Sequence, residues 1–89
     1  MPIISMFYGI IIRMFYFDNK EHHLPHIHIE YQDFNAVISI ETSEILAGIF
    51  PPNKLKLVLA WIEIHKDELM ANWKLATEGN SIFKIDGLK

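Results

Sequence analysis

The stretch PHIHIEYQDFNAVISI, residues 25–40, decides the expected fold. Polar and apolar side chains alternate over residues 26–31, which is the period of a β-strand with one buried face. A polar Gln-Asp pair follows, and residues 36–40 form a second run rich in β-branched side chains. The stretch therefore predicts a β-hairpin whose first strand carries His26, His28 and Glu30 on one face.

Apolar runs on both sides of this hairpin predict further short strands. Residues 10–17 are rich in isoleucine and aromatic side chains, with Arg13 as the one charge, and such a run is typical of a buried strand. Residues 3–7 and 45–49 are shorter apolar runs of the same kind. We expect a small, mostly antiparallel sheet.

After Pro51 and Pro52 the apolar period changes to that of an amphipathic helix, and proline suits the first turn of a helix. The pattern allows one long helix or two helices hinged at residues 65–67. We predict a single domain, residues 1–89, of α+β class: a small, mostly antiparallel sheet with one long C-terminal amphipathic helix, straight or kinked, packed on one face. The expected apolar stripe consists of Leu55, Leu59, Ile62, Leu69, Trp73 and Ala76.

A cluster of histidines is the main candidate for a functional site. Four of the five histidines fall within seven residues, at His22, His23, His26 and His28. Side chains two apart on a strand point the same way, with Cα atoms about 6.5 Å apart. The imidazoles of His26 and His28 can therefore converge on one ligand, with a loop histidine folded over them.

Three interpretations of this cluster remain open. The first is a metal site for zinc, nickel or iron, with His26 and His28 as ligands beside Glu30 or His22. The second is acid–base catalysis without a metal, such as RNA cleavage by its own 2′-hydroxyl, with Arg13 holding the phosphate. The third is that the histidines cover a sheet or contact a partner, in which case Arg13 pairs with Glu30 or Asp18.

Composition limits the class of protein. The 89 residues contain no cysteine, which excludes disulfides and thiolate metal sites and favours a reducing compartment. The net charge of −3 argues against broad, non-specific nucleic-acid binding. A hydrophobic fraction of 51% favours a surface covered by a partner or by a second copy, so we expect a homo-oligomer. The apolar N-terminus lacks the features of a signal peptide and is too short to span a bilayer, so we expect a cytoplasmic protein without membrane contact.

The motifs resemble those of a family of short bacterial proteins known as domain-of-unknown-function family 4160. Pro25-His26-Ile27-His28 is similar to that family's Pro-His-x-His signature, and His22 corresponds to a further histidine upstream. The loop before Pro25 is longer than in many relatives, so His23 can take the place of His22. The resemblance runs over nearly the whole chain, through Phe7-Tyr8-Gly9-Ile10, Ile12-Arg13-Met14, residues 36–40, Gly48, Pro51, Leu55, Trp61, His65, Glu68-Leu69, Asn72-Trp73, Ile85 and Leu88.

This resemblance implies a role in a two-gene module. Members of the family are often encoded beside a second small protein, in an arrangement similar to toxin–antitoxin pairs, and this chain would be the toxin-like partner of a small antitoxin-like protein. The resemblance gives the histidine cluster a use as the active site of a ribonuclease-like toxin. His22, His26 and His28 would then be catalytic, and Arg13 and His23 would bind the RNA or nucleotide.

Overall fold

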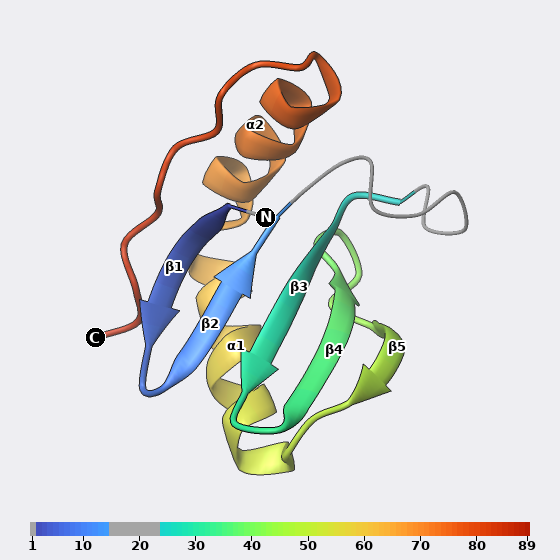
Figure 1. The fold of residues 1–89 in the computed structure, drawn as a ribbon, viewed down its shortest axis with the longest axis vertical. Coiled ribbons are helices and arrows are strands. Elements are labelled where there is room, and N and C mark those ends of the chain that lie inside the picture. Colours follow the sequence, from blue (N-terminus) through green and yellow to red (C-terminus); the bar gives the residue numbers. More distant parts are fainter. Residues whose placement is uncertain (1, 15–23) are drawn as a thin grey trace.

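The computed structural model describes residues 2–14 and 24–89 and has five strands followed by two helices. Figure 1 shows the strands side by side in one sheet, with α1 behind it and α2 at the upper end of the same side. Apart from the start of β3, where Trp73 of α2 packs on His26, no described element covers the other side of the sheet. The strands are β1 (Ile3–Phe7), β2 (Ile10–Arg13), β3 (His26–Tyr31), β4 (Phe34–Ser39) and β5 (Ile45–Ile49), and the helices are α1 (Pro52–Ile64) and α2 (Lys66–Thr77).

The sheet is antiparallel throughout, and its strands lie in sequence order from β1 to β5. Tight turns make this possible. Tyr8 and Gly9 both have positive φ, as a two-residue hairpin turn that matches the strand twist requires. The predicted hairpin over residues 26–40 is confirmed, with His26 opposite Ser39 and Tyr31 opposite Phe34.

The prediction of one long C-terminal helix is wrong, because the chain forms two helices that meet at His65. This residue has φ −110° and ψ 21°, outside helical geometry. A straight helix over residues 52–77 would be about 39 Å long. The longest dimension of the molecule is 34 Å, so the break lets both helices stay against the sheet. Asp67 and Glu68 in the first turn of α2 favour a helix start there.

The core lies between the inner face of the sheet and the helices. Alternate residues of the strands point inwards, and the fully buried side chains include Ile10, Ile12, Ile27, Ile29 and Ile38. The helices contribute Val58, Trp61, Ile62, Leu69 and Trp73. Of the predicted helix stripe, Ile62, Leu69 and Trp73 are buried, while Leu55 and Leu59 are half-buried and pack at the margin of this core.

The segment after α2 turns back and runs beside β1 as an irregular strap (Figure 1). Three contacts hold it. The side-chain amide of Asn72 donates to the carbonyl oxygen of Phe83 at 2.7 Å and accepts from the Phe83 N–H at 2.9 Å. The Trp61 Nε1–H donates to the carbonyl of Asp86, and the Ile85 N–H donates to the carbonyl of Ile4, both at 2.7 Å. The strap thereby closes the β1 side of the core.

The last strand, β5, approaches β4 closely at Gly48. This residue has φ +88° and lies opposite Ala36. The register shifts between Val37 and Ile38, so the edge strand carries a bulge at Leu46. Within the described residues, neither helix has the length and apolar character that crossing a membrane requires.

Candidate functional site

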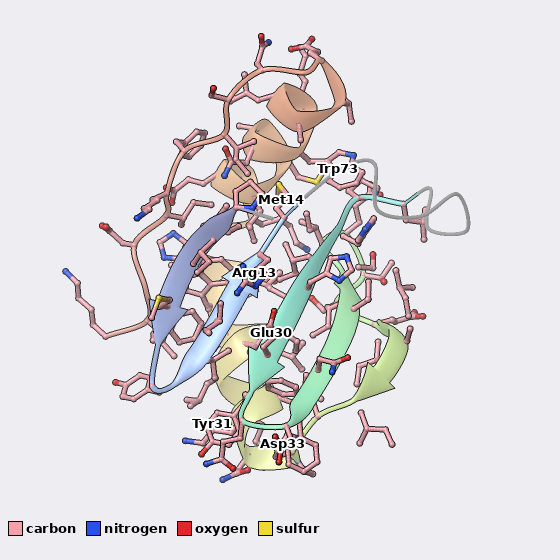
Figure 2. All side chains as sticks on the ribbon, in the orientation of Figure 1. Arg13, Met14, Glu30, Tyr31, Asp33 and Trp73 are labelled. Carbon is pink, nitrogen blue, oxygen red and sulfur yellow. The ribbon has the colours of Figure 1, made fainter. Side chains whose placement is uncertain are left out.

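The centre of the uncovered sheet face carries three polar side chains from two neighbouring strands. Alternation along β2 and β3 directs Arg13, His28 and Glu30 away from the core. Arg13 lies directly opposite His28 in the register, and Glu30 is the next outward residue along β3. The Arg13 Nε–H donates to Glu30 Oε2 at 2.6 Å, and Figure 2 shows the two side chains meeting in front of the sheet. We call Arg13, His28 and Glu30 the face triad.

The ion pair within the face triad lies partly in solvent. The Arg13 side chain is 23% exposed and the Glu30 side chain is 36% exposed. Pairs this exposed stabilise a fold by only about 0–1 kcal/mol, because water and salt screen the two charges. The main effect of the pair is therefore to hold a guanidinium and a carboxylate in fixed positions on the surface. A binding or catalytic site needs charged groups held in this way.

His26 is adjacent to the face triad but is entirely buried. Its Nδ1 lies 2.7 Å from the carbonyl oxygen of Leu24, and because a carbonyl only accepts, Nδ1 carries the hydrogen. The ring packs on Trp73 of α2, with centroids 5.0 Å apart, and on the ring of His28 at 5.3 Å. The two histidines are thus in contact, as their spacing predicts. His28 is partly open to solvent. The buried ring of His26 supports the ring of His28 by packing against it.

The other candidate histidines lie elsewhere. His22 and His23 fall in residues 15–23, outside the described part of the chain. His65 lies at the junction of the helices, where its Nδ1 is 2.5 Å from Glu68 Oε1 and its ring packs on Trp61 at 5.5 Å. It is the residue directly before α2, and its side chain makes no capping hydrogen bond to the backbone of that helix.

The metal-ligand set proposed from the sequence was His26, His28 and Glu30. Over residues 2–14 and 24–89, the structure contains no group of three His, Asp or Glu side chains arranged to hold a metal ion. Within this set, Glu30 already accepts from Arg13, and the Nδ1 of His26 donates to a backbone carbonyl. The bond that Glu30 accepts engages its Oε2, whereas a bond from one ring nitrogen to a carbonyl is common in metal-ligating histidines and does not oppose a metal site.

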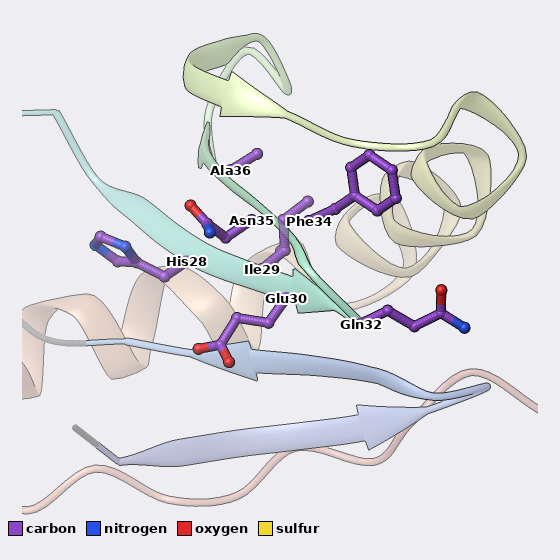
Figure 3. A pocket seen from close by; sticks show the side chains of 7 residues that line it. All are labelled: His28, Ile29, Glu30, Gln32, Phe34, Asn35 and Ala36. Atoms are coloured by element: carbon purple, nitrogen blue, oxygen red, sulfur yellow. The ribbon is translucent and has the colours of Figure 1, made fainter.

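A shallow pocket of about 240 Å³ adjoins His28 and Glu30 over the β3–β4 hairpin (Figure 3). It is lined by His28, Ile29, Glu30, Gln32, Phe34, Asn35 and Ala36. Asn35 was missed by sequence reasoning, although it lies directly opposite Glu30 in the register. Continuing the outward face of β3 onto its hairpin partner would have identified it. Its amide adds a hydrogen-bond donor and acceptor beside the face triad.

We expect His26→Ala to destabilise the fold far more than His28→Ala. The first change removes a buried ring and its hydrogen bond, which corresponds to a loss of about 2–4 kcal/mol in the free energy of unfolding. The second removes a partly exposed ring and should cost at most about 1 kcal/mol. Urea unfolding followed by circular dichroism measures both values. Equal losses would contradict the assignment of a supporting role to His26.

Comparison with known proteins gives one match. The family model described as Domain of unknown function (DUF4160) matches residues 9–74, which covers β2 to the middle of α2 and includes the whole face triad. Curated proteins and solved structures give no match.

Proposed function

This chain belongs to the DUF4160 family, a family of unknown function, and from its sheet face we propose that the protein cleaves RNA as the toxin-like half of a two-gene pair. One observation carries the proposal: a guanidinium, an imidazole and a carboxylate are held together on the part of a sheet face that no described element covers. These groups can bind a phosphate, donate a proton and accept a proton. RNA carries its own nucleophile, the 2′-hydroxyl, so the reaction needs no further group from the protein.

The chemistry divides between Glu30 and His28. The Glu30 carboxylate takes the proton of the 2′-hydroxyl while that oxygen bonds to phosphorus. The bond from phosphorus to the 5′-oxygen breaks, and protonated His28 donates a proton to the leaving oxygen. The products are a 2′,3′-cyclic phosphate end and a 5′-hydroxyl end. One proton is taken up and one is released, and exchange with water restores both groups.

Arg13 supplies the charge that this reaction needs. The guanidinium lies beside Glu30 and opposite His28, so it can bind the non-bridging oxygens of a phosphate placed between the two. Negative charge grows on those oxygens as the 2′-oxygen attacks, and a fixed cation stabilises that state more than the ground state. The net charge of −3 therefore does not oppose the proposal, which depends on one local cation.

Induced expression tests the proposal. In cells lacking the neighbouring gene, the wild-type protein should slow growth and fragment RNA, and the purified protein should leave 2′,3′-cyclic phosphate ends. His28→Ala and Glu30→Gln should each lower the cleavage rate about 10²–10⁴-fold while circular dichroism shows an intact fold. Glu63→Gln, at an exposed position on α1, is the matched control and should remain active. Normal growth and intact RNA with the wild type would exclude the proposal.

A non-catalytic binding module is the second candidate, and the apolar ends of the same face favour it. Met6 and Ile49 end the cross-strand row that contains Glu30, and they are 63% and 75% exposed. A polar centre with an apolar rim also suits a protein partner or a second copy. This candidate predicts equal growth of the wild type and the face-triad variants, together with co-purification of the neighbouring gene product. A monomer that binds no partner on co-expression would exclude it.

A further inference from the structure

A second hollow adjoins the face triad from the side of β1 and the C-terminal strap. Its volume is about 440 Å³. Arg13 forms part of its wall, and the same residue is bonded to Glu30, which lines the pocket over the β3–β4 hairpin. The Arg13–Glu30 ion pair therefore stands between two hollows. The second hollow is lined by Pro2, Ile3, Ile4, Arg13, Ile82, Phe83 and Lys84.

The lining of this hollow combines two cations with an apolar wall. Arg13 and Lys84 come from β2 and from the strap, and none of the lining residues in the described part of the chain is acidic. Phe83 is 40% exposed, so part of its ring is open to a ligand. Positive charge beside an exposed aromatic ring is the combination that binds single-stranded nucleic acid, because phosphates pair with the cations and bases stack on the ring.

The wall is held in place before any ligand arrives. Both backbone groups of Phe83 are bonded to the buried amide of Asn72, at 2.7 and 2.9 Å. The Ile85 N–H, just beyond Lys84, donates to Ile4 of β1. A fixed wall lowers the conformational cost of binding. The strap is thus tied to the sheet directly beside the residues that would contact a ligand.

We infer that this hollow is the subsite for the nucleotide next to the scissile phosphate of a single-stranded RNA. Lys84 binds the adjacent phosphate, and Phe83 with the apolar wall receives the adjacent nucleoside. The inference rests on the proposed function, since it takes the phosphate at Arg13 as the one that is cleaved. It adds that the substrate is a strand crossing the sheet face, rather than a mononucleotide.

Binding of short DNA strands tests the subsite apart from cleavage, because DNA lacks the 2′-hydroxyl. Fluorescence anisotropy at low salt compares a labelled dinucleotide with a labelled tetranucleotide. The wild type should bind the longer strand about tenfold more tightly, and Lys84→Glu should lose most of that gain. Phe83→Ala should weaken the binding of both strands, because the dinucleotide already carries the adjacent nucleoside. Lys56→Glu, an exposed lysine on α1, makes the same charge change away from the hollow and should keep the gain.

The outcomes distinguish this inference from the proposed function. If Lys84→Glu and Lys56→Glu weaken tetranucleotide binding equally, the hollow is not a subsite and the inference is overturned. RNA cleavage that is nevertheless present and independent of strand length would then leave the proposed function standing alone. If binding depends on Lys84 and Phe83 but RNA stays intact, the subsite is supported and the proposed cleavage is excluded.

Discussion

Replacing Gly48 by alanine is expected to lower the free energy of unfolding by about 3 kcal/mol or more. Two costs combine. A left-handed φ of +88° costs an alanine roughly 1–2 kcal/mol. The new Cβ would also collide with the Asn35 carbonyl oxygen and lie 2.8 Å from the Cα of Ala36. Both are backbone atoms, so β5 must move as a whole, together with Phe50 and the start of α1.

Gly79→Ala provides the matched control for this prediction. Gly79 has a similar φ of +76°, but a Cβ there would meet no atom within 4 Å. The control variant therefore has the backbone strain without the collision, and its free energy of unfolding should fall by about 1–2 kcal/mol. In a domain of this size 1 kcal/mol corresponds to roughly 4–8 °C in Tm, so thermal unfolding should separate the two variants clearly. Equal values of Tm would mean that β5 does not approach β4 as closely as described.

Asn72→Ala is expected to cost about 3 kcal/mol. The Asn72 side chain is fully buried and makes two hydrogen bonds to the backbone of Phe83. Alanine would leave an N–H and a carbonyl of the strap without their partner, at roughly 1–3 kcal/mol for each group that water cannot reach. The strap would loosen along β1, so amide hydrogen exchange should quicken at Phe83 and Ile85.

The control for this change is Asn80→Ala, an exposed asparagine at the start of the same strap. It should alter the free energy of unfolding by no more than about 0.5 kcal/mol. Urea unfolding of both variants gives the comparison. A loss below 1 kcal/mol for Asn72→Ala would show that the strap is held by its other contacts, the Trp61 bond to Asp86 above all.

The strands were predictable because their signals are local. Alternation over residues 26–31 places Ile27 and Ile29 in the core, where both are fully buried. The expected short strand at residues 45–49 is β5. The break between α1 and α2 has no such local signal. Ile62 and Leu69 are seven residues apart, close to two helical turns, so the apolar stripe stays in phase across the break at His65. Periodicity alone therefore left one long helix and two helices hinged at residues 65–67 as alternatives, and the structure has the second.

Only part of the site could be predicted. The pairing of Arg13 with Glu30 was one of the sequence alternatives, because both point outwards from neighbouring strands. The burial of His26 was not foreseen. Strand alternation gives the direction of a side chain but not what covers it, and the covering ring, Trp73, lies far along the chain on α2. The role of Asn72 was hidden for the same reason, since its partner is the strap.

The sequential order of the strands has a consequence for folding during synthesis. Each strand pairs with the one made just before it, so the sheet contains no crossover and most of its contacts join segments close in sequence. The isoleucines of its inner face, however, are covered mainly by α1 and α2, which are synthesised after all five strands. A nascent sheet therefore displays a wide apolar surface until both helices have been made. A chain terminated within the helices would be an aggregation-prone fragment that chaperones must bind, rather than a smaller stable protein.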